Sequence, residues 1–287
     1  QLLKMNLNVI TQDKSNLDLL DSSQVEKFMN ITKPDVVIVC AAKVGGIIAN
    51  VNSPYTFLFE NLSIQSNLLN SARKEEVKKL IFLGSSCIYP RNCKQPIKES
   101  YLLSDLLEKT NEAYAIAKIS GIKMCQSIRR QFNLDFISVM PTNLYGPNDN
   151  FDRDNSHVIP GIIRKIYEAK KNGENTVELW GTGKPLREFL HVEDCADGII
   201  FLLKNYSEDS HINLGSGEEI SIEKLAYEIK NLMSFNGKII FNKSFPDGTP
   251  RKFLDSSRIN NLGWKPKINL SNGLKNTIDF FIKNEIK

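Results

Sequence analysis

The sequence predicts an α/β fold: a Rossmann-like, doubly wound parallel sheet with a smaller α/β cap that would bind a substrate. Three apolar runs of strand length support the sheet: Asp35 to Ala42, Lys79 to Leu83 and Asp135 to Val139. Stretches of helical length separate these runs, as the crossover connections of parallel strands require. Because small or polar residues follow each run, we expect a functional site at the carboxyl edge of the sheet.

The usual start of such a domain is missing from this sequence. A doubly wound domain normally opens with a strand, a glycine-rich turn and a helix whose N-terminus holds a pyrophosphate. Here the first glycines are Gly45 and Gly46, which follow what we expect to be a later strand. Either the sequence is a fragment of a longer chain or cofactor binding has been lost. We expect a fragment, because the other parts of the site are present.

Short local patterns predict the elements in chain order. Leu7 to Thr11 is expected to be a short strand. The next helix is expected to end at Ile31 and to be capped by Ser22 or Ser23, with Glu26 placed for a capping box. Further helices are expected at 55–73, 112–132, 158–171, 222–233 and 270–282, and a further strand at 176–180; 193–203 and 212–215 are expected to return to the main domain.

Composition restricts the class of protein. Of the 287 residues, 41% are hydrophobic and 24% are charged, which is ordinary for a globular chain, and the net charge is +4. The charges are scattered and no apolar segment approaches about 20 residues, so we expect no nucleic-acid partner and no membrane span. The 5 cysteines form no CxxC pair, which favours reduced thiols, a cytoplasmic location and no metal site.

Two motifs carry the chemistry. One is Gly84 to Pro90, a turn of small residues after a buried strand; the other contains Tyr114 and Lys118, four residues apart in a helical segment. Residues at i and i+4 lie on one face of a helix, so this lysine can approach the tyrosine. A nearby cation stabilises a phenolate, so we expect Lys118 to lower the pKa of Tyr114 from about 10. A serine hydroxyl from the strand end would complete a proton-handling set around a carbonyl or alcohol.

Seven blocks of sequence, the two motifs among them, stand in an order that is typical of one enzyme family. They are Ala41 to Ile47, Gly84 to Pro90, Asn111 to Lys118, Met140 to Pro147, Asn155 to Pro160, Arg187 to Val192 and Pro246 to Lys252. Together they resemble the GDP-L-fucose synthases, in the extended branch of the short-chain dehydrogenases/reductases. The resemblance runs from about residue 14 to the C-terminus and places Gln1 near the end of the first helix of such a domain.

The resemblance implies five catalytic residues: Ser85, Cys87, Tyr114, Lys118 and His157. Cys87 and His157 would be the base and acid that invert carbon centres, and the sequence does not separate their roles. In a 4-keto sugar the carbonyl acidifies the protons on C3 and C5, and thiols and imidazoles exchange protons near neutral pH. Ser85 and Tyr114 would donate to the enolate oxygen. Tyr114 would protonate O4 after hydride transfer, and Lys118 would hold the nicotinamide ribose.

The same resemblance implies a nicotinamide cofactor. Residues expected to contact it are Lys14, Leu83, Gly84, Ser85, Ser86, Lys118, Pro141, Thr142, Asn143, Leu144 and His157. Lys14 lies where these synthases carry a basic residue, at the strand end that meets the adenine ribose. Because a cation suits a 2′-phosphate, we favour NADP(H) over NAD. The alternative is that Lys14 is a solvated loop residue.

A GDP-sugar substrate is implied as well. Four residues fall at GDP-sugar-binding positions of the family: Lys165, Trp180, Arg187 and Asp247. Arg187 suits a diphosphate, because a guanidinium group donates two parallel hydrogen bonds. Lys165 stands where we expect an arginine, a change that keeps the charge and loses this forked geometry.

Domain boundaries and assembly complete the expectations. Residues 1–145, with a return at 190–216, are expected to form the NADP-binding domain, and 146–189 with 217–287 the substrate-binding cap. The resemblance also implies a homodimer through the helices at 55–73 and 112–132. Burial in the core would explain the apolar faces of these helices equally well.

The leading functional hypothesis is NADPH-dependent 3,5-epimerisation and 4-reduction of GDP-4-keto-6-deoxy-D-mannose to GDP-L-fucose. A close alternative is the same chemistry on another GDP-4-keto sugar, such as a deoxyheptose; Cys87 and His157 together favour an epimerase over a simple reductase. An alternative from a different class is a non-catalytic binding scaffold. The missing glycine loop favours that scaffold, and the intact catalytic set opposes it.

Overall fold

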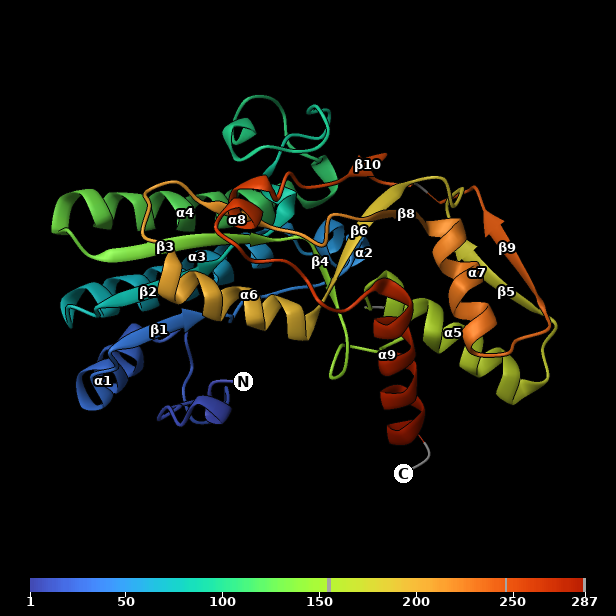
Figure 1. Cartoon of the computed structure of the whole chain (residues 1–287), viewed down its shortest axis with the longest axis horizontal. Coiled ribbons are helices and arrows are strands. Elements are labelled where there is room, and N and C mark those ends of the chain that lie inside the picture. Colours follow the sequence, from blue (N-terminus) through green and yellow to red (C-terminus); the bar gives the residue numbers. More distant parts are fainter. Residues whose placement is uncertain (154–155, 246, 286–287) are drawn as a thin grey trace.

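The computed structural model describes residues 1–153, 156–245 and 247–285, and a four-stranded parallel sheet lies at its centre (Figure 1). In sheet order the strands are β1 (Val36–Val39), β2 (Lys79–Leu83), β3 (Asp135–Pro141) and β7 (Ile212–Leu214). Every residue of β3 except the first is buried, as is all of β7, because these strands are covered on both faces. Asn155 and Pro246, which belong to two of the motif blocks, lie outside the described residues.

Helices cover both faces of this sheet. One face carries α1 (Ser22–Thr32), α3 (Pro54–Lys74) and α4 (Glu112–Phe132), and the other carries α6 (Val192–Asn205) and α8 (Ser257–Asn261). Within β2, Leu80 and Phe82 belong to the first of these cores and Ile81 to the second, since successive side chains of a strand point to opposite faces. The expected doubly wound α/β arrangement is confirmed.

A second group of elements lies beyond the carboxyl edge of the sheet, to the right in Figure 1. It contains α5 (Val158–Asn172), α7 (Ile222–Leu232), α9 (Leu270–Glu285) and the parallel pair β5 (Thr176–Trp180) and β9 (Lys238–Asn242), which share a third core. Between the groups run β10 (Arg251–Lys252), β6 (Leu186–His191) and β4 (Asn143–Tyr145), with β8 (Glu219–Ser221) antiparallel to β6. The polypeptide therefore places one layered unit against another at the edge where the site was expected.

Two expectations about the N-terminal part are wrong. Residues 7–11 do not form a strand, because an extended segment needs a paired neighbour and the described sheet ends at β1. The cap of α1 is Asp21, whose Oδ1 accepts from the N–H groups of Ser23 and Gln24 at 2.9 and 3.1 Å. The side chain that returns to Asp21 is Gln24, at 3.0 Å, rather than Glu26.

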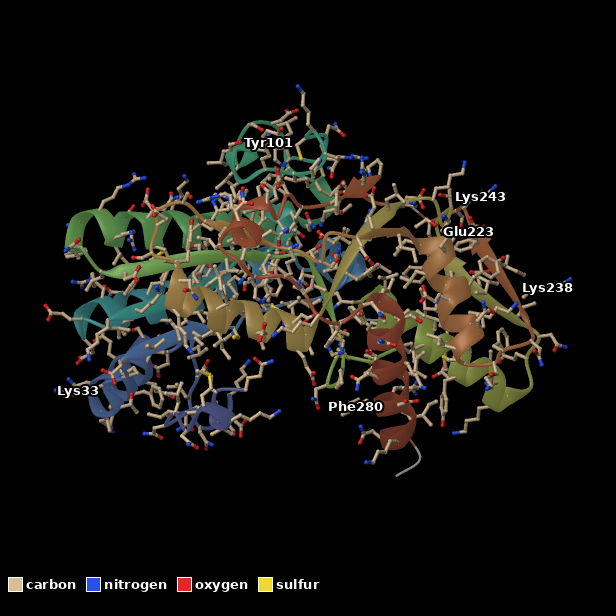
Figure 2. The ribbon with its side chains drawn as sticks, in the orientation of Figure 1. Lys33, Tyr101, Glu223, Lys238, Lys243 and Phe280 are labelled. Carbon is tan, nitrogen blue, oxygen red and sulfur yellow. The ribbon has the colours of Figure 1, made fainter. Side chains whose placement is uncertain are left out.

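The later helices and strands lie where they were expected, with ends shifted by a few residues. The sequence did not indicate the short helix α2 (Ile47–Asn52), which follows the glycine loop, or the 3₁₀ turns η1 (Leu3–Met5), η2 (Ser86–Ile88), η3 (Glu99–Tyr101) and η4 (Lys109–Asn111). The lysines labelled in Figure 2, Lys33, Lys238 and Lys243, are exposed at separate places on the surface. In the part of the chain that the structure describes, no helix is long and apolar enough to cross a membrane, and no three or more His, Cys, Asp or Glu side chains are grouped so that they could hold a metal ion.

Candidate active site

The turn that carries Ser85 and Cys87 begins where β2 ends. Ser85 caps η2, and its Oγ lies 2.8 Å from the Sγ of Cys87 and accepts from the Cys87 N–H at 3.4 Å. A Cβ at Gly84, just before this turn, would lie 2.3 Å from the Sδ of Met140 on the neighbouring strand, so a larger residue there would require the end of that side chain to shift. The serine and the thiol are thus held together by the local geometry of one tight turn.

Helix α4 brings Tyr114 and Lys118 to the same turn. The Tyr114 hydroxyl forms a hydrogen bond with Ser85, and the Nζ of Lys118 donates to the backbone oxygen of Leu83 at 2.8 Å. That lysine is 96% buried, since its exposed fraction is 4%, and its Nζ lies 5.8 Å from the centre of the Tyr114 ring. Four of the five predicted catalytic residues, Ser85, Cys87, Tyr114 and Lys118, therefore form one cluster.

Burial, not the lysine, governs the acidity of Tyr114. Burial raises the pKa of Tyr114 above its ordinary value, the nearby Cys87 raises it further, and the hydrogen bond with Ser85 lowers it. The expectation that Lys118 lowers the pKa of Tyr114 is not met in this structure. The reason is that Lys118 is itself desolvated, which lowers its own pKa to about 8, and its ammonium group is directed to Leu83. Tyr114 is consequently a protonated phenol, the form that a proton donor requires.

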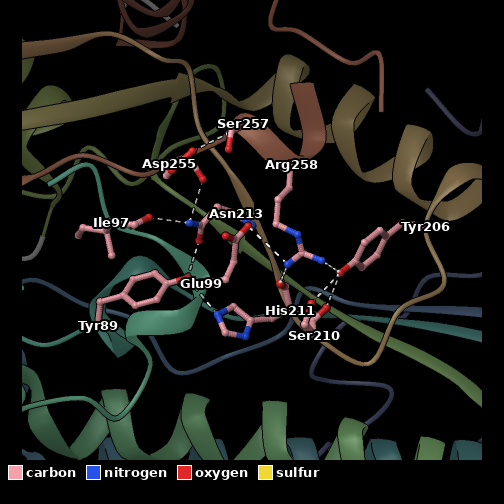
Figure 3. A network of polar contacts seen from close by, with 10 residues as sticks. All are labelled: Tyr89, Ile97, Glu99, Tyr206, Ser210, His211, Asn213, Asp255, Ser257 and Arg258. Atoms are coloured by element: carbon pink, nitrogen blue, oxygen red, sulfur yellow. Dashed lines mark hydrogen bonds and ion pairs between the residues drawn. The ribbon is translucent and has the colours of Figure 1, made fainter. Parts of the chain in front are cut away.

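A buried polar network is attached to the turn of Ser85 and Cys87 through Tyr89 (Figure 3). Tyr89, at the end of η2, donates its hydroxyl proton to the Oδ1 of Asn213 at 2.5 Å, and its oxygen lies 3.0 Å from the Nε2 of His211. Because Tyr89 donates its phenol proton to Asn213, the Nε2 of His211 must carry a proton and donate it to the Tyr89 oxygen. Burial lowers the pKa of His211 to about 4, with Arg258 and Lys123 adding to the effect. Within the network, Tyr89 reaches Asn213 of β7 and the adjoining His211 through uncharged groups, and the ion pair of Arg258 with Glu99, 3.8 Å apart, lies beside them.

The predicted nicotinamide segment, Pro141 to Leu144, lies at the end of β3 and the start of β4. The Oγ1 of Thr142 and the Nδ2 of Asn143 both donate to the backbone oxygen of Glu188, at 3.2 and 2.7 Å. These side chains fasten the carboxyl edge of the central sheet to β6. Lys14 lies on an exposed turn, and no described contact joins it to the catalytic cluster.

His157 approaches the site from the other unit. It stands at the N-cap position of α5 without a side-chain capping hydrogen bond, its side chain is 53% exposed, and its Nδ1 lies 3.9 Å from the Oδ1 of Asp149. No described contact joins it to Cys87. The glycine loop before α2 comes close to the same segment, since a Cβ on Gly46 would lie 3.6 Å from the backbone oxygen of Ser156. His157 and Cys87 therefore approach the site from different elements.

The four predicted GDP-sugar residues form two adjoining pairs. Lys165 donates to the backbone oxygen of Glu178 at 3.0 Å, and its Nζ lies 5.2 Å from the centre of the Trp180 ring. Trp180 is 45% exposed and stacks on Phe245 with ring centres 4.5 Å apart. Sequence reasoning missed Phe245, because only the pairing of β5 with β9 brings these rings together.

Asp247 and Arg187 form the second pair. Both carboxylate oxygens of Asp247 are engaged by Thr182, with the backbone N–H at 2.7 Å and the hydroxyl at 2.8 Å. Burial lowers the pKa of Arg187, and the nearby Asp247 raises it. Asp247 thus holds its loop against the turn after β5, and the guanidinium of Arg187 lies within the influence of that carboxylate.

Two further residues near Cys87 were not singled out from the sequence. Glu108 and Lys252 line a small cavity together with Cys87. Lys252 belongs to the last of the seven motif blocks, so the sequence did contain a signal that could have identified it. Glu108 caps η4 by accepting from the Thr110 N–H at 3.3 Å, and an acidic residue two positions before a threonine at a helix start was the available sign.

The chain as a whole was compared with known proteins. A model described as the NAD dependent epimerase/dehydratase family matches residues 2–215, a span that includes every strand of the central sheet. The chain belongs to this family. It is therefore an enzyme of the NAD dependent epimerase/dehydratase type, as the sequence motifs predicted.

The comparison also found individual relatives and solved structures that are similar to this chain. GDP-L-fucose synthase 1 of Arabidopsis thaliana is 54% identical over 277 residues, which are 96% of this chain and 86% of the relative. A GDP-L-fucose synthetase from Naegleria fowleri bound to NADP has a TM-score of 0.91 at 29% identity, covering 100% of this chain and 89% of that one. A GDP-6-OMe-4-keto-L-xylo-heptose reductase from C. jejuni also has a TM-score of 0.91, at 34% identity, with 98% and 92% covered. The predicted resemblance to GDP-L-fucose synthases is confirmed.

Proposed function

We propose that this chain converts GDP-4-keto-6-deoxy-D-mannose to GDP-L-fucose by 3,5-epimerisation and NADPH-dependent 4-reduction. One observation carries the proposal: Ser85, Cys87, Tyr114 and Lys118 form a single cluster at the carboxyl edge of the sheet. The 54% identity to a GDP-L-fucose synthase supports the same assignment. A simple alcohol dehydrogenase has no use for a thiol in that position, whereas an epimerase needs a group that exchanges carbon-bound protons.

Epimerisation requires proton exchange on both faces of the sugar. Cys87 would remove the proton from C3 or C5, and the electron pair would pass to the carbonyl oxygen as an enolate. Ser85 and Tyr114 are placed to donate hydrogen bonds to that oxygen. His157 would return a proton on the opposite face, and its 53% exposure leaves it open to solvent. The Oδ1 of Asp149 lies 3.9 Å from its Nδ1.

Reduction uses the same tyrosine. When bound, NADPH supplies a hydride to C4, and the residues around that position fit its nicotinamide end. The buried ammonium group of Lys118 can hold ribose hydroxyls, and Pro141 to Leu144 provide a strand end beside it. Tyr114 then donates its phenol proton to O4. The raised pKa of Tyr114 keeps that proton in place until negative charge develops on the sugar oxygen.

The remaining assignments extend this proposal. Lys14 would select the 2′-phosphate of NADP, since it is a lysine on an exposed turn. Arg187 would bind the diphosphate of the substrate, and Trp180 with Lys165 would bind the guanine, because Trp180 is 45% exposed and an indole ring can pack against a base. Asp247 would order the loop that closes over the nucleotide.

Domain division and location are also proposals. Residues 1–145 with 190–216 would bind the cofactor, and 146–189 with 217–287 would form the cap, in keeping with the separate core shared by α5, α7 and α9. In the second segment Leu254, Ile259 and Trp264 pack into the cores of the central sheet, so that segment also braces the first unit. Five free cysteines support a cytoplasmic location.

We propose that the chain is a homodimer through α3 and α4. Tyr55 and Phe59 on α3 are 72% and 52% exposed and stack on each other, and Ile116 on α4 is 43% exposed. Exposed apolar side chains on two adjacent helices are typical of a protein contact surface. Light scattering of the Tyr55→Glu, Phe59→Glu double variant tests this, since it should halve the mass; an unchanged mass would place the contact elsewhere.

A second candidate substrate is another GDP-4-keto sugar, such as a deoxyheptose. The structural similarity to the C. jejuni heptose reductase favours it. The discriminating assay gives the purified chain NADPH with GDP-4-keto-6-deoxy-D-mannose or with a 4-keto-heptose, and identifies the products by NMR. Faster oxidation with the 6-deoxy sugar, yielding GDP-L-fucose, supports the main proposal. Preference for the heptose would replace it, and the absence of NADPH oxidation with either sugar would favour a binding scaffold.

A further inference from the structure

A small cavity lies beside Cys87. It measures about 10 Å³, the room of a single water molecule, and its walls include Cys87, Tyr89, Glu108 and Lys252. None of the roles proposed above uses this space. The cavity matters because it is bounded by a group that handles protons and by two buried ionisable side chains.

Glu108 is the buried carboxyl group of this cavity. Its exposed fraction is 8%, and its Oε1 accepts from the N–H and hydroxyl of Thr110, both at 3.3 Å. Its Oε2 is buried without a hydrogen-bond partner among the described residues, although the Nε of Arg91 lies 3.2 Å away. A buried oxygen of this kind is costly unless something can donate to it, and a water in the cavity is a suitable donor.

Lys252 is a second ionisable residue that lines this cavity. The side chain of its neighbour Arg251 is bound to Glu219 on β8 at 2.6 and 2.8 Å. Arg251 and Lys252 both line the cavity. Burial lowers the pKa of Lys252, and the charges of Cys87 and Glu108 act against that effect. The charged groups around the cavity are therefore Glu108, Lys252, Arg251 and, behind the carboxylate, Arg91.

If one acid–base pair inverts two carbon centres in turn, each group must recover its starting protonation state between the two inversions. After the first inversion, the base holds a proton that came from carbon and the acid has lost one. His157 is half exposed and can exchange with solvent directly. Cys87 is only partly exposed, and a sugar bound over it would cover the side away from the cavity. The second inversion therefore needs a route by which the thiol proton leaves.

We propose that Glu108 takes the proton from Cys87 through the cavity and releases it to solvent beside Arg91, so that the same thiol can act at the second carbon centre. This inference rests on the proposed epimerase function. In the step, the S–H bond breaks and its electron pair stays on sulfur. A water in the cavity receives that proton and passes one of its own to the Oε2 of Glu108. The carboxyl group then loses its proton to bulk water past Arg91, whose side chain is 47% exposed.

The test follows deuterium from D₂O into C3 and C5 of GDP-4-keto-6-deoxy-D-mannose during a single turnover without NADPH. The variant is Glu108→Gln, which keeps an oxygen acceptor for the Thr110 N–H and cannot carry a proton. We expect it to label one centre at the wild-type rate and the second centre at least tenfold more slowly. In the wild-type chain both centres should acquire label at similar rates.

Two further variants separate this role from a structural one. Glu108→Asp keeps a carboxyl group and should restore much of the labelling at the second centre. Thr110→Ala loses a hydrogen bond to the same carboxylate and should leave the ratio between the centres unchanged. Equal slowing of both centres in Glu108→Gln, or no slowing of either, would overturn the proposal. Label uptake by the wild-type chain reports on the epimerase function alone, whereas the ratio between centres reports on Glu108.

Discussion

Tyr114 has an unusual environment for a proton donor, because burial and a neighbouring thiol both raise its pKa. It should therefore remain protonated throughout the neutral range and act as an acid only once the sugar oxygen becomes negative. Tyr114→Phe keeps the ring and its edge contact with Phe57, whose centre lies 6.4 Å away. We expect NADPH oxidation to fall by about 10²- to 10⁴-fold, the usual effect of losing a positioned acid.

The control for Tyr114→Phe is NADPH binding, measured by the fluorescence of the reduced nicotinamide. Binding should persist, because Lys118 is held by the backbone oxygen of Leu83 rather than by the tyrosine hydroxyl. Turnover at the wild-type rate would remove Tyr114 from the chemical step.

Cys87 makes a different prediction, because its sulfur should act on carbon and not on oxygen. Cys87→Ser replaces the sulfur with a hydroxyl that fits the same turn and is a much weaker base near neutral pH. We expect exchange of the C3 and C5 protons with solvent to stop, as followed by NMR in D₂O. Reduction of a ketosugar already inverted at both centres should continue, because Ser85, Tyr114 and Lys118 remain in place. If exchange persisted in the variant, a different base would have to be found.

Among the elements, α4 is the one that holds the site together, and its contact with the sheet depends on Gly121. A Cβ at that position would lie 2.3 Å from the ring of Phe82 on β2 and 2.8 Å from the Oε1 of Gln65 on α3. Gly121→Ala gains about 1 kcal/mol of helix propensity, whereas forcing a methyl group into a packed core costs about 1–3 kcal/mol. The clash involves a rigid ring, so we expect a net loss of stability.

Urea unfolding of Gly121→Ala should show this loss as a lower midpoint with an unchanged slope. Ser120→Ala, on the more exposed side of the same helix, is the matched control and should change stability by less than about 0.5 kcal/mol. A Gly121→Ala variant as stable as the wild type would mean that the α3 and α4 pair can move apart at low cost.

For the whole molecule, His211 should make stability depend on acidity. Its pKa is lowered to about 4 in the folded chain by burial and is about 6.5 when unfolded. Because the pKa of His211 is lower in the folded chain than in the unfolded chain, its full contribution to the free energy of unfolding is present above pH 6.5. That contribution is lost as the pH falls toward 4, since the unfolded chain then binds the proton more tightly. The loss amounts to about 2 kcal/mol at pH 5.

The measurement is the free energy of urea unfolding at pH 7 and at pH 5. His211→Gln should cost about 1 kcal/mol at pH 7, because the contact with Tyr89 is weakened, and should reduce the difference between the two pH values. Other acidic and basic groups also make the free energy of unfolding depend on pH, so the prediction concerns the difference between the wild-type chain and the variant. The same pH dependence in both chains would show that His211 is not the acid-sensitive group.

Much of the site could be predicted because its signals are local. Ser85 and Cys87 are separated by one residue in a turn, and Tyr114 and Lys118 by one helical turn, so spacing alone places each pair together. The parallel sheet was equally predictable, since its strands are continuous apolar runs. The strand expected at residues 7–11 failed for the opposite reason: a strand exists only with a partner, and its sequence cannot state where that partner is.

Only the tertiary structure determined the contacts between residues that are far apart in the chain. Tyr89 meets His211 and Asn213 across more than 100 residues, and Trp180 meets Phe245 through the pairing of β5 with β9. Glu108 and Lys252 line one cavity with Cys87. Burial likewise set the direction of the Tyr114 pKa against the expectation from its neighbouring lysine. The amino-acid order identifies which groups can do the chemistry, because it fixes their types and local spacing. Desolvation and long-range packing depend on the assembled fold, and these determine the state in which each group works.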